Sequence, residues 1–260
     1  MPRIAIGTPD KTRAVPCPPG TAGGGEVRAY FDGDAPLHLH EHRLAAGESL
    51  SIGPRETDFL AYVWSGSAQA AGTELPAGSS AIVENGAKLA IAAGSGGAVL
   101  LAFAAASPGG GSLGGHVHLL PADRVPRTAE LGGAGGVGGA MHADGGCPTC
   151  AVWLHENHFP GSPGLTPDEQ QRGVHSHSED EIIFVTAGQV RLGTRLYGPG
   201  TALAIAADTL YSFTPGPEGL SFINFRAGKP GDIQFANGMR IDEPGYWRDR
   251  LPRPDYLEVA

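Results

Sequence analysis

Apolar residues in the second half of the chain occur in short runs that glycine, proline or aspartate interrupts. Such runs, rich in β-branched and aromatic residues, are typical of β-strands. No long stretch follows the 3.6-residue period of an amphipathic helix. The pattern predicts these strands: Ala151–Phe159, His175–Ala187, Gln189–Leu196, Thr201–Ala206, Leu210–Thr214 and Leu220–Arg226. It favours an all-β sandwich or barrel, with either a short helix or a surface wrap in the proline-containing tail, Asp242–Ala260.

An internal repeat organises the chain. Three segments of the first half match three of the second half in the same order: LHEHRL at 39–44 with LHENHF at 154–159, FLAYVWSG at 59–66 with EIIFVTAG at 181–188, and LPAGSSAI at 75–82 with YGPGTALA at 197–204. The last two pairs share one offset, which indicates two copies of one β unit. We therefore predict domains at 1–112 and 113–260, a linker at 107–112 and a glycine-rich loop at 131–146.

Composition narrows the classes of partner and compartment. The chain has 260 residues, a net charge of -9, 41 glycines and 22 prolines. An acidic chain without a lysine or arginine cluster is a poor partner for nucleic acid or an anionic membrane. No apolar run approaches the roughly 18 to 20 residues of a membrane span, and the N-terminus has no signal-peptide core. Three cysteines make no disulfide framework, so we expect a cytoplasmic protein.

The segment after the second glycine-rich piece concentrates metal-binding side chains. His175, His177 and Glu181 have one parity, so on a strand their side chains leave the same face. On a helix, His175 would point away from His177. Two neutral imidazoles and one carboxylate form a three-point metal site with open positions for water or substrate. This ligand set suits Fe, Mn, Ni or Zn without selecting one of them, whereas a solvated polar strand would not need the matching parity.

This pattern resembles the cupins. His175, His177, Glu181 and Gly188 have the order and spacing of the first cupin motif, and Gly200 resembles the glycine that opens the second. With the repeat, the chain is similar to a bicupin, which implies two small β-barrels and commonly a homodimer. Tyr211 stands where the family normally supplies a further histidine ligand. The resemblance therefore leaves three roles for Tyr211: a phenolate ligand, an acid or base, or packing inside the barrel.

Two other features depart from the family pattern. Glu169 replaces a glycine that usually precedes the first motif histidine, beside an apparent insertion at Leu165–Arg172. In the first copy, Gly53, Arg55 and Phe59 stand opposite His175, His177 and Glu181, and Leu89 stands opposite Tyr211. Such residues cannot hold a metal ion, so we expect the first copy to be a structural or dimerising barrel.

The remaining histidines and cysteines can have either a structural or a functional role. Trp153 and His155 share one face of a predicted strand and border the metal pocket if that face lines the barrel; otherwise they lie at a sheet or subunit interface. We expect His116 and His118 to be structural, because no carboxylate follows them at the required spacing. The pair Cys147 and Cys150 precedes a strand and lacks a second cysteine pair, so we expect no functional role for it.

The sequence therefore predicts a metal-dependent bicupin enzyme that acts on a small polar or carboxylate metabolite. Iron-dependent dioxygenase chemistry is the first candidate, because the ligand face leaves room for both dioxygen and substrate. The alternatives are a lyase, decarboxylase or hydrolase that uses Mn, Zn or Ni with Tyr211 as acid or base, and a non-catalytic ligand-binding module. The predicted site comprises the ligands His175, His177, Glu181 and Tyr211, with His155 catalytic and Trp153 in the substrate pocket.

Overall fold

A computed structural model describes residues 3–23, 25–107, 114–128, 138–162 and 173–259. The predicted linker lies outside these residues apart from Ser107. The same holds for residues 131–137 of the glycine-rich piece and for the Leu165–Arg172 segment. The predicted domain boundary between residues 112 and 113 therefore stays a prediction.

The chain forms two compact units. The N-terminal unit contains Lys11–Val125, Gly146–Val152 and Pro254–Ala260, and the C-terminal unit contains Met1–Asp10, Pro126–Gly145 and Trp153–Arg253. Each unit thus includes short segments from distant parts of the chain. Among the described residues, no helix has the length and apolar character needed to cross a membrane.

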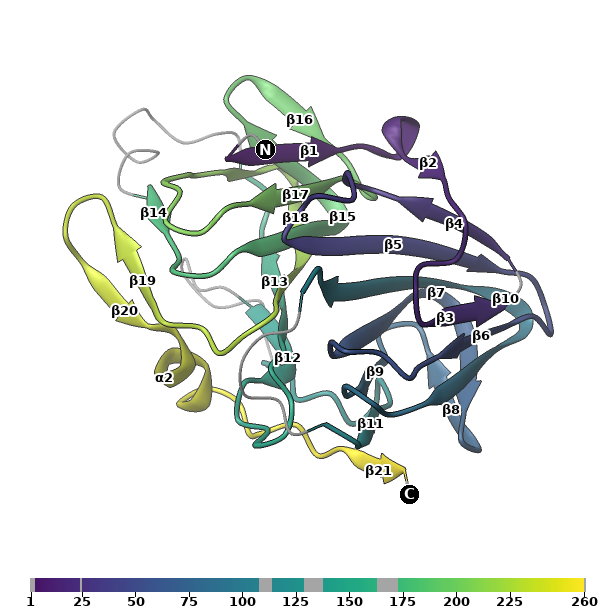
Figure 1. Ribbon diagram of the computed structural model, residues 1–260. Helices are drawn as coiled ribbons and strands as arrows, with labels where there is room; N and C mark the ends of the chain where they lie inside the picture. The colour runs from purple at the N-terminus through teal and green to yellow at the C-terminus, as the bar shows by residue number, and fades with distance from the viewer. Residues whose placement is uncertain (1–2, 24, 108–113, 129–137, 163–172, 260) are drawn as a thin grey trace. The chain divides into compact units, whose positions relative to one another are not determined.

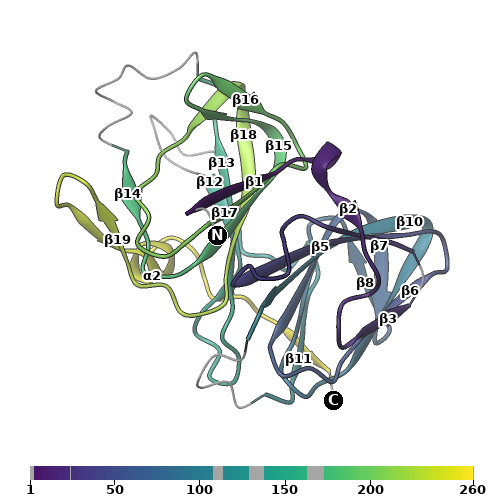
Figure 2. The ribbon, with the colours of Figure 1, turned by 45° about the horizontal axis from the view of Figure 1, so that its top comes forward.

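Strands dominate both units, which confirms the predicted all-β class. The N-terminal unit contains one sheet with these strands: β2 (Arg13–Ala14), β3 (Thr21–Gly23), β4 (Glu26–Ala29), β5 (Leu37–Leu44), β6 (Ser49–Ile52), β7 (Phe59–Ala70), β8 (Thr73–Pro76), β9 (Ser80–Val83), β10 (Leu89–Ala105), β11 (Val117–Leu120) and β21 (Leu257–Val259). A 3-10 turn, η1 (Pro9–Lys11), precedes it. Strands β5, β7 and β10 run side by side, with β10 paired to both of the others (Figure 2).

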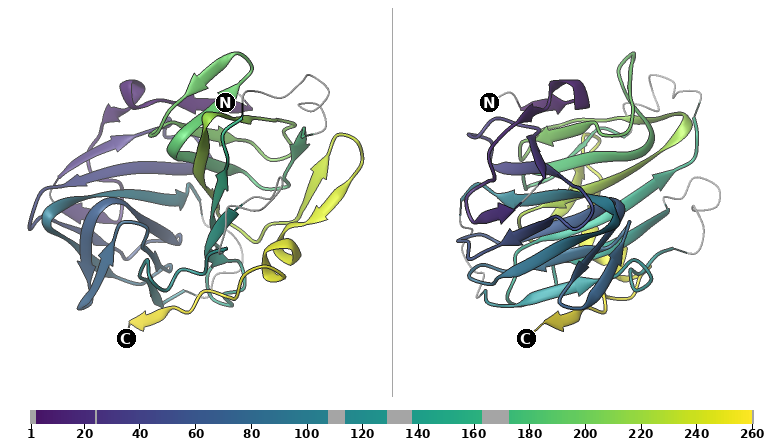
Figure 3. Two further views of the ribbon diagram at one scale, coloured as in Figure 1. Left: turned by 180° about the vertical axis from the view of Figure 1, so that it is seen from behind. Right: turned by 90° about the vertical axis from the view of Figure 1, so that its right-hand side faces the viewer.

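The C-terminal unit contains a seven-stranded sheet and a three-stranded sheet (Figure 1). The larger sheet consists of β1 (Ile4–Gly7), β12 (Gly138–Asp144), β13 (Trp153–Phe159), β15 (Glu181–Leu192), β16 (Arg195–Tyr197), β17 (Ala202–Ile205) and β18 (Thr214–Arg226). The smaller sheet consists of β14 (His175–Ser176), β19 (Asp232–Phe235) and β20 (Arg240–Asp242). The helix α2 (Glu243–Arg248) follows β20 directly, at the base of the β19–β20 hairpin (Figure 3). Its first turn is capped by Asp242, whose side chain accepts a hydrogen bond from the Gly245 amide.

The predicted repeat is visible in the strands. Strands β7 and β15 have the same length, as do β9 and β17. The register is also the same, because Phe59 pairs with Val83 in one unit and Glu181 pairs with Ile205 in the other. These strands of the two halves therefore share one length and one register.

Two matching glycines mark a matching irregularity of the two long strands. Gly66 in β7 has φ 75° and Gly188 in β15 has φ 66°. A Cβ atom at Gly66 would lie 2.1 Å from the carbonyl oxygen of Gly97, and one at Gly188 would lie 2.3 Å from that of Gly219. Only glycine tolerates both this conformation and this close approach, so the repeat keeps glycine at both positions.

Alternating side chains supply each unit with its own apolar core. In the N-terminal unit, Leu50, Leu75, Ile91, Leu100 and Leu119 are almost fully buried members of one cluster. The corresponding cluster of the C-terminal unit consists of Ile183, Val185, Val190, Leu203, Ile205, Tyr211, Leu220 and Phe222. Because the sheets supply these residues from alternate strand positions, the other parity is available for polar side chains.

Three predicted strands differ from the observed ones. The stretch Gln189–Leu196 is not one strand, because its first residues continue β15 to Leu192 and β16 begins at Arg195 after a turn at residues 193–194. The stretch His175–Ala187 is not continuous: β14 pairs with β19 in the small sheet, and β15 begins only at Glu181. The turn between them is held by the Asp180 carboxylate, which accepts from the Ala207 amide at 3.0 Å. Leu210–Thr214 is likewise not a strand, and Tyr211 forms only an isolated bridge with His175. Local composition could not reveal these long-range hydrogen bonds.

We expect the buried His42 of β5 to make the folded protein less stable in acid. Neither ring nitrogen of His42 has a hydrogen-bond partner among the described residues, and burial lowers the pKa of His42 from 6.5 to about 4. As the pH falls, His42 takes up a proton in the unfolded chain before it does so in the folded chain. The free energy of unfolding is therefore highest above pH 6.5 and decreases towards pH 4. Without this histidine, we expect His42→Leu to lose about 2 to 3 kcal/mol less free energy of unfolding in acid than the parent, since each pKa unit corresponds to about 1.4 kcal/mol. Urea unfolding at pH 7.5 and pH 4.5 measures this, and equal acid losses in variant and parent would contradict it.

Candidate functional site

A cavity of about 370 Å³ in the C-terminal unit brings together most of the predicted site. His155, His175, His177 and Tyr211 all line it. Asn224 and Arg226 of β18 and Glu243 of α2 complete its polar part. Glu181 is buried behind this surface, where it accepts a hydrogen bond from Asn224 and lies beside Tyr211. Residues that are distant in sequence therefore meet because β13, β14, β15, β18 and α2 converge here.

The ring of His175 is oriented by the backbone. Its Nδ1 lies 2.8 Å from the carbonyl oxygen of Gly173, so Nδ1 carries the hydrogen and Nε2 carries a lone pair. Burial lowers the pKa of His175, which keeps the ring neutral. A neutral imidazole with Nδ1–H bound to a carbonyl has the tautomer that a metal-ligating histidine needs.

His177 lies between two carboxylates. Its Nδ1 is 3.4 Å from Oε2 of Glu243 and its Nε2 is 4.0 Å from Oε2 of Glu181. The contact to Glu243 is too poorly aligned for a hydrogen bond, and Nδ1 has no such partner among the described residues. His177 is nevertheless placed as a histidine with a carboxylate behind one nitrogen and its other nitrogen towards Glu181.

Glu181 begins β15 and has one oxygen occupied. Its Oε2 accepts a 2.6 Å hydrogen bond from Nδ2 of Asn224, and the Tyr211 phenol lies beside the carboxylate. Its Oε1 has no hydrogen-bond partner within the described part of the chain. Burial opposes ionisation, but Arg226, His177 and these hydrogen bonds outweigh it and lower the pKa of Glu181. The carboxylate is therefore ionised, with one oxygen available to a ligand.

Arg226 and Glu243 are the main site residues that sequence reasoning missed. Nη1 of Arg226 lies 2.6 Å from Oε2 of Glu243, and Nη2 lies 3.4 Å from both Oε2 of Glu181 and Nε2 of His177. Arg226 is 1% exposed. The signal was an arginine at the end of the apolar strand Leu220–Arg226, since a buried charge on such a strand requires partners.

The buried charges do not balance. Glu181 and Glu243 contribute two negative charges and Arg226 contributes one positive charge, while burial keeps His155 and His175 neutral. Arg226 lowers the pKa of Glu243 despite the opposing effect of burial, so Glu243 remains ionised. Counted over these groups and without His177, which lies between the two carboxylates, one negative charge is left over, and a bound cation would balance it.

Tyr211 is held as a neutral phenol. Burial, followed by the charge of Glu181 and the hydrogen bond to it, raises the pKa of Tyr211 well above 10. The neutral Tyr211 phenol keeps its proton beside the Glu181 carboxylate. These contacts favour the acid–base alternative for Tyr211 over the phenolate-ligand alternative.

His155 lines the cavity, whereas Trp153 lies behind it. The indole nitrogen of Trp153 donates a 2.7 Å hydrogen bond to Nδ1 of His155, which assigns the hydrogen of the neutral ring to Nε2. Burial lowers the pKa of His155 to about 4. Trp247 of α2, with its ring centroid 5.0 Å from that of His155, supplies the indole that lines the cavity. Trp153 thus orients His155 and is not among the lining residues.

The donor atoms at this site match a divalent metal ion in kind. His175 Nε2 carries a lone pair, and Glu181 Oε1 is buried without a partner among the described residues. His177 Nε2 faces Glu181, but Nη2 of Arg226 lies against both. Arg226 and a metal ion would therefore compete for the same lone pairs, and the ligand assignment stays a prediction.

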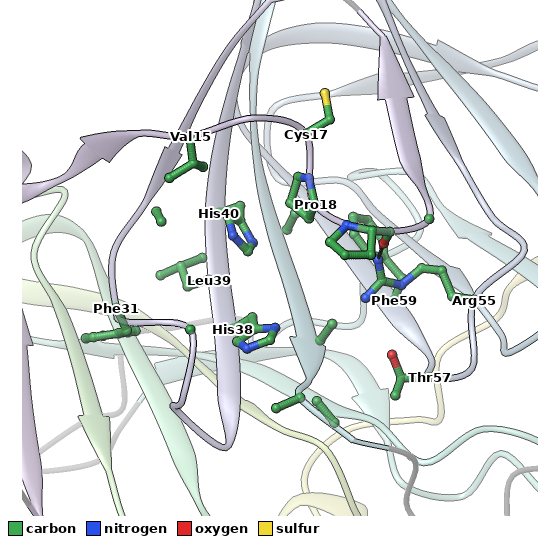
Figure 4. A pocket seen from close by; sticks show the side chains of 18 of the residues that line it. Val15, Cys17, Pro18, Phe31, His38, Leu39, His40, Arg55, Thr57 and Phe59 are labelled. Atoms are coloured by element: carbon green, nitrogen blue, oxygen red, sulfur yellow. Dashed lines mark hydrogen bonds between the residues drawn. The ribbon is translucent and has the colours of Figure 1, made fainter. Parts of the chain in front are cut away.

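The N-terminal unit contains a second cavity of about 700 Å³ (Figure 4). Arg55 and Phe59, which stand opposite His177 and Glu181 in the repeat, both line it. The guanidinium carbon of Arg55 lies 5.3 Å from the ring centre of Phe59, and Nη1 of Arg55 donates to the carbonyl of Pro19. These positions hold a cation and an aromatic ring, neither of which is a metal ligand.

Solved structures of other proteins share this fold. The protein Ylba from E. coli superposes with a TM-score of 0.63 at 15% identity over 87% of this chain and 91% of that chain. Lactobacillus farciminis oxalate decarboxylase in its formate complex superposes with a TM-score of 0.63 at 11% identity over 93% and 89%. A Bacillus subtilis oxalate decarboxylase studied for its Mn(II) centres gives 0.62 at 12% identity over 89% and 79%. No family model and no curated protein sequence matches the chain. The structural likeness shows that the chain has a cupin fold.

Replacing Arg226 tests the charge balance of the site. Arg226→Met leaves Glu181 and Glu243 buried without their cation, so we expect a loss of about 3 to 5 kcal/mol in the free energy of unfolding. Added Mn²⁺ should restore part of that loss, because it compensates the same carboxylates. Denaturant unfolding with and without EDTA measures both effects. Arg248→Met is the control, since Arg248 is exposed and its contact to Asp242 is 3.9 Å long; equal losses in the two variants would contradict the assignment.

Proposed function

We propose that the chain is a metal-dependent enzyme built from two cupin barrels, with its active site in the cavity of the C-terminal unit. One observation carries the proposal: His175 and His177 line one cavity, and His177 faces the buried carboxylate of Glu181. His175, His177 and Glu181 would hold the ion, with Mn and Fe as the first candidates. A bound divalent ion would polarise a carbonyl or carboxylate and lower the pKa of bound water.

The cavity favours a small substrate with one polar end. A volume of about 370 Å³ lies at the small end of the range for ligand pockets. Aromatic and aliphatic side chains form most of the wall: Phe159, Ile183, Phe213, Phe222, Ile233, Phe235, Ile241, Tyr246 and Trp247. The polar residues of the lining are His155, Asn157, His175, His177, Tyr211, Asn224, Arg226 and Glu243. A carboxylate or carbonyl group would face these, and the rest of the molecule would pack on the rings.

The residues around Tyr211 support non-oxidative acid–base chemistry. A neutral phenol beside the ligand carboxylate can deliver a proton to a substrate bound at the polar end, and Glu181 can accept the hydrogen bond throughout. His155 would donate a hydrogen bond through Nε2–H and help to orient the substrate. We therefore place a lyase, decarboxylase or hydrolase of a small carboxylate first. The structurally similar Bacillus subtilis oxalate decarboxylase, which has Mn(II) centres, agrees with this choice as an analogy.

Dioxygenase chemistry is the second candidate. Two histidines and one carboxylate on one face leave adjacent open positions for substrate and dioxygen. The two candidates differ in a simple observable, because the dioxygenase consumes dioxygen and the lyase or hydrolase does not. Oxygen uptake during turnover of small carboxylates therefore separates them.

Removing a ligand tests the metal site. We expect the parent to take up one Mn²⁺ per chain and His177→Ala to bind it at least tenfold more weakly, since a lost ligand exceeds the effect of a lost outer contact. His38→Ala is the matched control, because His38 is half-buried in the cavity of the other unit. Equilibrium dialysis measures both. A folded parent that takes up neither Mn²⁺ nor Fe²⁺ would overturn the proposed function, and unchanged uptake by His177→Ala would overturn the ligand assignment.

Replacing the phenol separates catalysis from binding. We expect Tyr211→Phe to keep its Mn²⁺ and to lose activity by roughly 10² or more, the usual contribution of a positioned acid or base. Metal content and turnover are measured on the same preparation. A variant with full activity would show that Tyr211 only packs the barrel, and a metal-loaded parent inactive towards a broad panel of small carboxylates would favour a binding module.

A further inference from the structure

Four metal-binding side chains meet in the N-terminal unit, away from its cavity. Glu84 follows β9, His118 lies in β11, and Cys147 and Cys150 belong to the segment Gly146–Val152. Their ligand atoms all lie within 4.8 Å of one another. Among the described residues this is the group of three or more such side chains compact enough to hold an ion. Sequence reasoning predicted no function for the cysteine pair, because its partners are 29 or more residues away.

The separations suit a tetrahedral ion bound by sulfur, nitrogen and oxygen. Sγ of Cys147 lies 3.5 Å from Oε1 of Glu84 and 3.9 Å from Nε2 of His118. Bond lengths of about 2.3 Å to sulfur and 2.0–2.1 Å to nitrogen and oxygen place such atoms roughly 3.5 Å apart around zinc. Nε2 of His118 and Oε1 of Glu84 are closer, at 2.7 Å, the length of a hydrogen bond. Binding an ion would part these two atoms to roughly 3.3 Å, a small adjustment of two side chains.

The surrounding contacts are those of a prepared ligand set. Nδ1 of His118 lies 2.7 Å from Oε1 of Glu258 in the neighbouring strand β21, so a carboxylate stands behind the ring nitrogen that would not bind the metal. Oε2 of Glu84 accepts from the His116 amide at 3.1 Å, which orients that carboxylate. Sγ of Cys147 accepts from the Cys150 amide at 3.1 Å, a contact that stabilises a thiolate.

We infer that Glu84, His118, Cys147 and Cys150 form a structural zinc site. Two thiolates favour zinc over Mn or Mg, and four protein ligands fill a tetrahedral site and leave no position for substrate. Glu84 and Cys150 are buried, in keeping with a closed site. This site is distinct from the proposed Mn or Fe site, whose donors are nitrogen and oxygen only.

The inferred ion would connect a segment without strands to the strands of the N-terminal unit. Gly146–Val152 contains no strand, yet it belongs to the N-terminal unit. Through Cys147 and Cys150 it would be tied to β11 and to the end of β9, and through Glu258 the contact extends to β21. Zinc would thus hold both the Gly146–Val152 segment and β21 in the N-terminal unit, and removal of zinc should loosen both segments.

Cobalt substitution tests the site without confusion with the proposed active site. Full-length protein is stripped with a chelator and titrated with Co²⁺, and the near-ultraviolet thiolate-to-cobalt charge-transfer band is recorded. We expect one equivalent of Co²⁺ to develop the band, one equivalent of Zn²⁺ to abolish it, and Cys147→Ser to lose it. Cys17→Ser is the matched control and should retain the band, because Cys17 lies outside the group.

Failure of the zinc site and failure of the proposed active site give different results in this experiment. His177→Ala should also retain the band, so failure of the proposed active site leaves this test intact. A parent that is folded by circular dichroism and binds Co²⁺ without a thiolate band would overturn the inference, and so would a Cys147→Ser variant that keeps the band. If Cys147→Ser does not fold, a fall in the Tm of the parent on zinc removal, reversed by Zn²⁺ alone, is the result expected, and an unchanged Tm with no bound zinc would overturn it.

Discussion

The guanidinium of Arg226 between the carboxylates of Glu243 and Glu181 is the constraint on which the C-terminal unit depends. Two buried carboxylates can stay ionised only if a cation lies beside them. The three residues come from β18, α2 and β15, so the ion pairs fix the short helix and the start of β15 around one point. Because one arginine cannot balance two carboxylates, a further positive charge here, such as the proposed metal ion, would compensate the second carboxylate.

The matching strands of the two units carry different side chains at the positions that correspond in the repeat. At the position of Arg226 on β18, the repeat places Ala104 on β10, and Arg55 and Phe59 stand where the C-terminal unit has a histidine and a glutamate. The N-terminal cavity therefore lacks the carboxylate at the start of its long strand. Its metal-binding side chains lie instead at the end of β9, on β11 and in the 146–152 segment, where an ion would support structure.

Sequence patterns predicted the local features and missed the long-range ones. The spacing of the cupin motif brought His175, His177, Glu181 and Tyr211 to one region, although the continuous strand expected to give them a common face is interrupted before Glu181. The repeat predicted matching strands with matching glycines. Glu243 could not be anticipated, because α2 reaches the site only through the β19–β20 hairpin. The grouping of Glu84 and His118 with Cys147 and Cys150 likewise depends on strand pairing between distant segments, which no local pattern encodes.

The central claim is that the buried site beside Arg226 binds a divalent metal ion through His175, His177 and Glu181. Anomalous diffraction from crystals soaked with Mn²⁺ tests it most directly. The expected result is a manganese peak within about 2.0 to 2.3 Å of Nε2 of both histidines and of the Glu181 carboxylate, with Nη2 of Arg226 displaced from His177 Nε2. A saturated soak that leaves Arg226 against His177 and Glu181, with no manganese peak between them, would contradict it.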